Sequence, residues 1–182
     1  MPDRHKKFVD DVVMAVSEVD ERLLYTALTE SEMEPREIAA LSPQIMDQLR
    51  TGKGITHPAE HCDMNGDTIL HYAAGSGHGY VLDYLIALQM SEAQCGDHQA
   101  ESDMIARIIN SSNSEGNTPL HDAVKKQRVQ TLALLVRFGA DASRKNKAGE
   151  TPKGLAKKLS RTSVEMKEAV DILHGGAKCG SC

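Results

Sequence analysis

The sequence predicts an all-α protein built from stacked helix pairs, and three observations lead to this fold class. A motif of glycine, threonine and small apolar residues recurs after the first third of the chain. Apolar residues between its copies recur three or four positions apart, as on one face of a helix. Aromatic residues make up only 3% of the 182 residues, so the core has to be built from small aliphatic side chains.

The N-terminal segment, residues 5–50, has the apolar spacing of several short helices. A stripe of apolar residues predicts the first of them: Phe8, Val9, Val12, Val13 and Val16. Asp20 is a candidate cap for a second helix. Pro35 and Pro43 are candidates for the first positions of two further helices, the last ending at Gly52. We predict that residues 1–51 form a helical cap, a degenerate repeat or a recruitment segment, followed by a linker at 52–62.

A motif recurs after this linker, with copies that begin at Asp63, Asn113 and Asn146. The second copy contains Gly-Asn-Thr-Pro-Leu-His-Asp-Ala and later Gly-Ala-Asp. Its glycine, Gly116, lies 33 residues before Gly149 but 50 residues after the glycine of the first copy. The first copy therefore carries 17 additional residues, which we place within about 89–108.

These residues closely resemble the ankyrin repeat, whose core is Gly-x-Thr-Pro-Leu-His-x-Ala-Ala and whose period is 33 residues. The resemblance covers residues 63–175 and leaves 176–182 as a flexible tail. It implies an ankyrin-repeat solenoid of helix-turn-helix units joined by β-hairpin loops. It also implies a non-catalytic scaffold without a cofactor, which binds a protein partner through its concave face.

The motif residues fit this architecture on physical grounds. Three glycines stand where a tight hairpin needs a positive φ: Gly66, Gly116 and Gly149. Three threonines are candidate helix caps: Thr68, Thr118 and Thr151. Pro119 and Pro152 follow at the first helical position, and Gly139 is a candidate C-cap. We expect His71 and His121 to hydrogen-bond to backbone between neighbouring hairpins rather than to bind a ligand. Lys153, Lys157 and Lys158 give the third copy the solvated face of a terminal repeat.

The resemblance also assigns variable contact positions on the hairpin tips and the first helices. By motif position these are Met64, Asn65, Asp67, Ser76, Ser114, Glu115, Asn117, Lys125, Lys126, Lys147, Ala148 and Glu150. Charge changes along this strip from acidic near Asp63 and Asp67 to basic in the later copies: Lys125, Lys126, Arg144, Lys145 and Lys147. We therefore predict a protein partner with an acidic patch that faces the C-terminal half.

Two other function classes remain open. One is a two-surface adaptor, whose N-terminal helices recruit a second protein, as in a bacterial effector acting in host cytosol or a small scaffold. The run from Glu21 to Leu41 resembles an F-box faintly, but it lacks that family's opening Leu-Pro and its later Cys and Trp. The other is a metal-binding regulator that uses the thiol and imidazole ligands preferred by zinc: His57, His61, Cys62, Cys95 and His98.

Composition and short motifs exclude several functions. The net charge of −5 and the scarcity of rings argue against a nucleic-acid partner. Four scattered cysteines and the lack of an apolar run of ~18 residues indicate a reducing, cytoplasmic protein. Cys179 stands where a prenylated cysteine would, but Gly180 and Ser181 replace the usual aliphatic pair, so membrane attachment is not expected. No nucleophile, metalloprotease, phosphate-loop or dinucleotide motif points to an enzyme.

Overall fold

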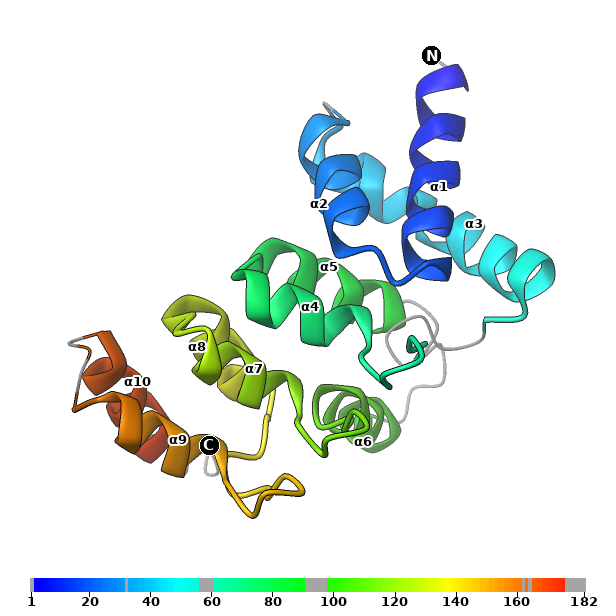
Figure 1. Cartoon of the computed structure of the whole chain (residues 1–182). Helices are drawn as coiled ribbons and strands as arrows, with labels where there is room; N and C mark the ends of the chain where they lie inside the picture. Colours follow the sequence, from blue (N-terminus) through cyan, green and yellow to red (C-terminus); the bar gives the residue numbers. More distant parts are fainter. Residues whose placement is uncertain are drawn as a thin grey trace.

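The computed structural model describes residues 2–31, 33–55, 61–90, 98–161, 163 and 165–175. Within them the chain is helical, and its β-pairing is one isolated antiparallel bridge between Cys62 and Thr68. The helices form a stack that runs from α1 at the N-terminal end to α10 at the other (Figure 1). They are α1 Pro2–Ser17, α2 Glu21–Glu30, α3 Pro35–Lys53, α4 Ile69–Ser76, α5 Gly79–Met90, α6 His98–Ile109, α7 Pro119–Lys125, α8 Val129–Arg137, α9 Pro152–Leu159 and α10 Glu165–Gly175. The predicted all-α class is confirmed.

The three N-terminal helices cover one end of the repeat stack. Helix α1 packs against both α2 and α3, while α2 contacts α4 and α5, and α3 contacts α5. At this junction the carboxylate of Glu21 is buried and forms an ion pair with His78. The Ser76 hydroxyl donates a hydrogen bond to the same carboxylate at 3.3 Å, and the Tyr25 ring stacks on His78 with centroids 4.1 Å apart. These helices therefore shield the apolar face of the first repeat. That they also recruit a second protein stays a prediction.

The prediction of a separate helix from Pro43 to Gly52 is wrong. Pro43 lies inside α3, which continues to Lys53 and ends at Gly54, a left-handed C-cap with φ 68°. Proline removes one backbone hydrogen bond from a helix interior. The helix continues through it because its apolar face is buried on both sides of that position, at Ile38 and Ile45. This tertiary packing outweighs the free-energy cost of the backbone hydrogen bond that Pro43 removes.

Each repeat begins with a capped helix, as the motif predicts. The Thr68 and Thr118 side chains each accept a hydrogen bond in the first turn of α4 and α7, and the Thr151 hydroxyl accepts one from the Gly154 N–H at 3.0 Å in α9. Pro119 and Pro152 occupy the first helical positions. The second helix of each pair packs behind the first: α5 behind α4, α8 behind α7 and α10 behind α9.

The core is aliphatic, in agreement with the low aromatic content. Phe8 and Tyr84 are the only Phe or Tyr residues that the described part of the chain buries fully. The additional residues of the first repeat form α6, whose Ile108 and Ile109 are buried. No helix among the described residues combines the length and the hydropathy needed to span a membrane.

Candidate functional site

The hairpins that precede α4, α7 and α9 share one closing device. In the second hairpin the Asn113 Oδ1 accepts the backbone N–H groups of Glu115 at 3.0 Å and Asn117 at 2.9 Å. Asp63 makes the equivalent two bonds in the first hairpin, at 2.8 and 2.9 Å. The tip glycine Gly116 has φ 75°, a conformation that side chains with a Cβ rarely adopt. The turn is therefore fixed by its own sequence.

Neighbouring hairpins are joined edge to edge. The Ser114 N–H donates to the Asn65 carbonyl at 2.8 Å, and the Lys147 N–H donates to the Glu115 carbonyl at 3.0 Å. A Cβ added at Gly116 would lie 2.9 Å from the Lys147 nitrogen, which shows how closely the loops approach. The tips consequently form one rigid row rather than three independent loops.

Two buried histidines hold this row to the helices. The His71 Nδ1 accepts the Thr68 N–H at 3.1 Å, and its Nε2 donates to the Asn117 carbonyl of the next hairpin at 3.0 Å. His121 repeats this arrangement, with its Nε2 3.1 Å from the Glu150 carbonyl. The predicted structural role of both histidines is confirmed. Burial lowers the pKa of each imidazole, so both rings are neutral near pH 7.

The predicted contact residues lie along the hairpin tips and the C-terminal ends of α4 and α7, a surface that we call the tip strip. Met64 is fully exposed, at 102%. Other predicted contacts are also exposed: Asn65, Ser76, Ser114, Glu115, Lys125, Lys126, Lys147 and Ala148. Asp67 and Glu150 are half-buried. Asn117 is the exception at 6% exposure, because its Oδ1 accepts the Asn146 side-chain amide at 2.9 Å and links two hairpins.

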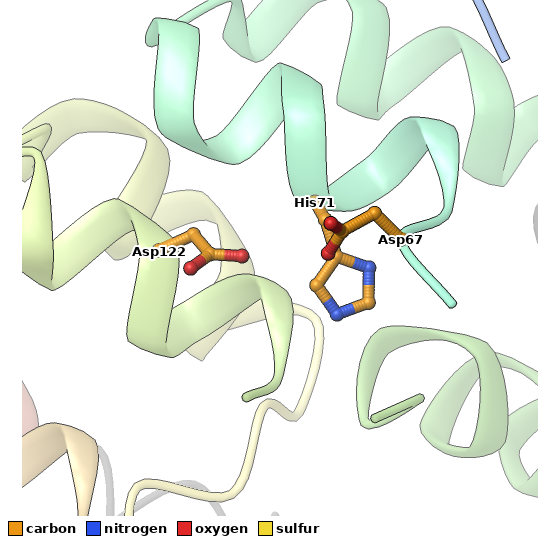
Figure 2. Close-up of side chains that lie close together, drawn as sticks. All are labelled: Asp67, His71 and Asp122. Atoms are coloured by element: carbon orange, nitrogen blue, oxygen red, sulfur yellow. The ribbon is translucent and has the colours of Figure 1, made fainter. Parts of the chain in front are cut away.

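A cavity of about 480 Å³ opens on the tip strip between the first and second repeats. Asp67, Tyr72, Asp122 and Lys126 line it. Figure 2 shows Asp122 projecting from α7 toward Asp67 and His71. Polar atoms of these three side chains lie within 4.8 Å of one another. The structure thus pairs two carboxylates that are 55 positions apart in the sequence.

The two carboxylates of this cavity have different surroundings. The Asp67 Oδ1 accepts the Asn113 side-chain amide at 2.7 Å. The Asp122 carboxylate accepts no hydrogen bond and forms no ion pair among the described residues. Burial, with a further contribution from the charge of Asp67, raises the pKa of Asp122 to about 6. Near neutral pH the cavity therefore holds a carboxylate that the protein itself does not neutralise.

Tyr72 and Asp122 belong to this cavity but were not among the predicted contacts. Tyr72 is 40% exposed, and its hydroxyl donates to the Asp63 Oδ2 at 2.7 Å. This bond lowers the pKa of Asp63 and raises the pKa of Tyr72 to about 12. Both residues occupy the position directly after the motif histidine. An aromatic or acidic residue at that place is the signal that could have identified them.

Among the residues predicted as metal ligands, the structure describes the side chains of His61 and Cys62, so the zinc site stays a prediction. His57 and Cys95 lie outside the described residues, and so does the side chain of His98. The His61 Nε2 is 3.1 Å from the Ser17 carbonyl of α1, and Cys62 is exposed. The Asp67–His71–Asp122 group is a closer match to a metal site, but both ring nitrogens of His71 are hydrogen-bonded, so it offers no free lone pair. Cys179 also lies outside the described residues.

Stacked helix pairs with joined hairpins and histidine bridges define a repeat protein of the solenoid class. A sequence profile described as "Ankyrin repeats (3 copies)" matches residues 38–146, which is more than half of the chain. The chain belongs to the ankyrin-repeat family. Repeats of this family are general protein–protein interaction modules, and its members are typically non-catalytic. The match begins within α3, which supports interpreting part of the N-terminal segment as a degenerate repeat.

The curated proteins that are similar to this chain include the following two. The nuclear factor NF-kappa-B p105 subunit of Gallus gallus is 24% identical over 156 residues, which is 84% of this chain and 14% of that protein. The BCL-6 corepressor-like protein 1 of Homo sapiens is 31% identical over 96 residues, which is 53% of this chain and 4% of that protein. The chain thus spans only a small part of the length of these relatives.

Proposed function

We propose that this chain binds a protein partner along the tip strip and has no catalytic role. One observation carries the proposal, namely the division of side chains on this face. Those that hold the hairpins, such as His71 and Asn117, are buried and bonded to the protein. The side chains of Lys125 and Lys126 are exposed, and their ammonium groups make no hydrogen bond or ion pair among the described residues. Exposed side chains on a rigid frame are available to a partner.

The rigidity of the tip strip favours binding. A loop that becomes ordered on binding costs conformational entropy, which weakens the complex. Here the hairpins are already fixed by the Asn113 and Asp63 caps and by the edge-to-edge bonds between tips. We therefore expect a partner to dock without rearranging the loops.

The charge of the tip strip supports a partner with an acidic patch opposite the C-terminal half. Basic side chains of the second and third repeats are exposed: Lys125, Lys126, Arg144, Lys145 and Lys147. The Arg144 guanidinium also donates to the Asn110 carbonyl. Complementary charge across an interface accelerates association and fixes orientation, and it is weakened by salt. Binding should accordingly fall as ionic strength rises.

Affinity purification of the full chain, followed by mass spectrometry, tests the proposal. We expect partners of the wild type to be lost from the Lys125→Glu/Lys126→Glu variant. For a purified partner, Kd should rise at least tenfold and depend less on salt, because two lysines that face acidic groups are removed. The Lys6→Glu/Lys7→Glu variant makes the same charge change on exposed positions of α1 and should bind as the wild type does. Unchanged affinity and unchanged salt dependence of Lys125→Glu/Lys126→Glu would refute the placement.

A further inference from the structure

The cavity between the first and second repeats has the chemistry of a receptor for a cationic side chain. Two carboxylates, those of Asp67 and Asp122, converge on it from different repeats, with oxygen atoms within 4.8 Å of each other (Figure 2). A planar guanidinium carries several N–H donors in a fixed fork and can bond to both carboxylates at once. The spacing of the two carboxylates therefore suits the guanidinium of arginine better than a compact cation such as the ammonium group of lysine.

Two of the protein's own cations, Lys126 and Arg128, line the cavity, but neither forms an ion pair with Asp67 or Asp122 among the described residues. Lys125 is also close enough to influence Asp122. The Arg128 Nε is engaged with the Gly75 carbonyl at 3.2 Å. Burial and the neighbouring Asp67 outweigh both lysines and hold the pKa of Asp122 near 6. Like charges left this close are repulsive, and an external cation would relieve the repulsion.

An aromatic side chain next to the carboxylates completes the site. The Tyr72 ring lines the cavity and is 40% exposed, whereas the fully exposed Met64 side chain lies at the preceding hairpin tip and is not part of the lining. Aromatic faces attract guanidinium groups, and an exposed methionine packs against partners of varied shape. An arginine bound between the carboxylates would thus have an aromatic wall on one side.

We infer that the Asp67–Asp122 cavity binds an arginine side chain of the protein partner, presented from a segment that also carries an acidic residue for Lys126. This inference rests on the proposed use of the tip strip and specifies the chemistry of the partner. The segment's arginine enters between the two carboxylates, and its neighbouring carboxylate meets the basic half of the strip. A divalent cation fits less well, because both nitrogens of His71 are committed to hydrogen bonds.

A random 12-residue peptide library displayed on phage provides the test. The library is selected on the immobilised full chain at pH 7.5, and enriched peptides are then synthesised. We expect them to contain an arginine, and we expect its replacement by neutral, nearly isosteric citrulline to weaken binding at least tenfold. The Asp67→Asn/Asp122→Asn variant should bind the arginine peptide at least tenfold more weakly than the wild type does. Replacing the arginine by citrulline should not weaken binding to this variant any further. The control Asp83→Asn/Asp171→Asn removes two exposed carboxylates outside the cavity and should bind as the wild type does.

Acidification supplies a second readout. Because Asp122 takes up a proton near pH 6, affinity for the arginine peptide should fall as pH drops through that value. The Asp67→Asn/Asp122→Asn variant should lack this dependence.

Three outcomes would overturn the inference in distinguishable ways. Peptides that depend on Lys125 and Lys126 but carry no cation, and bind Asp67→Asn/Asp122→Asn equally well, would refute the arginine site and leave the tip strip in place. Selection that yields no peptide sensitive to any substitution on the strip would refute both. Zn²⁺ or Ca²⁺ that binds the wild type stoichiometrically and is lost in Asp67→Asn/Asp122→Asn would show that the cavity serves a metal instead.

Discussion

The histidine bridges and the carboxylate cavity lie side by side between the same two repeats, but they differ in whether their polar atoms are hydrogen-bonded to the protein. Both nitrogens of His71 are paired with protein groups at hydrogen-bond distance. The Asp122 carboxylate, on the adjoining helix, has no such partner among the residues that the structure describes. Paired buried groups stabilise a fold, whereas an unpaired carboxylate near another costs free energy. The bridges therefore serve the structure, and the cavity is best explained by recognition.

The largest effect should come from breaking a bridge. His71→Ala leaves the Thr68 N–H without its partner, removes one of the two hydrogen bonds to the Asn117 carbonyl and removes a buried ring, so we expect a loss of about 3 kcal/mol in unfolding free energy. Urea denaturation followed by circular dichroism measures it. Tyr72→Phe, on the next residue of α4, removes an exposed hydroxyl and its surface hydrogen bond to Asp63, and it should cost less than about 1 kcal/mol. Equal losses in the two variants would contradict the distinction between bridge and cavity.

A smaller effect should separate inner from terminal hairpins. Gly116 and Gly149 have nearly equal φ values of 75° and 77°, so alanine is strained at both. Only at Gly116 does a new Cβ meet backbone, 2.9 Å from the Lys147 nitrogen, whereas Gly149 has open space. We expect Gly116→Ala to cost about 2 kcal/mol and Gly149→Ala about 1 kcal/mol, as measured by thermal unfolding. A larger loss of stability for Gly149→Ala than for Gly116→Ala would contradict the description of the third hairpin as the end of the row.

A stabilising substitution should come from the cavity. The folded-state pKa of Asp122 is raised from 3.8 to about 6, so the folded state favours its protonated form. Its contribution to stability is present below about pH 4 and is lost as pH rises through about 6. Asp122→Asn mimics the protonated form and should raise the unfolding free energy by about 1 kcal/mol at pH 7.5, after allowance for partial exposure. The gain should vanish at pH 4. A variant that is less stable than the wild type at pH 7.5 would show that the ionised carboxylate has a partner in the fold.

The smallest expected effect is the acid sensitivity of the bridges. Burial lowers the folded-state pKa of His71 and His121 below 6.5, so their stabilisation is present above that pH and is lost as pH falls through the folded-state values. In the Asp122→Asn variant, which lacks the opposing titration of Asp122, we expect the unfolding free energy to fall by about 1 kcal/mol between pH 7 and pH 5. The slope should be shallower when His71→Ala is combined with it. Equal slopes would mean that the pKa of His71 is the same in the folded and unfolded states.

Sequence alone predicted the features that depend on local chemistry. Thr118, Pro119 and Gly116 act within one turn of the chain, and their roles follow from backbone geometry. The bridge of His121 was also predicted, because the repeat brings the next hairpin to a fixed distance. The N-terminal α3 was divided wrongly at Pro43, because the burial that overrides a proline depends on distant helices.

The cavity escaped prediction because its parts come from two different repeats. Asp67 follows the glycine of the first motif copy, whereas Asp122 follows the histidine of the second, so the two carboxylates occupy different motif positions that lie 55 residues apart. Asp67 was predicted as a contact, but the sequence did not show that a second carboxylate faces it. The burial that raises the pKa of Asp122 is likewise a property of the packed helices α4 and α7, not of its neighbours in the chain.

The central claim, that different polar residues carry the fold and the recognition, is tested most directly on Asp122→Asn. Unfolding free energy and affinity for an arginine-containing peptide selected on the wild type are measured together at pH 7.5. We expect the variant to be more stable by about 1 kcal/mol and to bind the peptide at least tenfold more weakly. A variant that loses stability and keeps its affinity would assign Asp122 to the fold and contradict the claim.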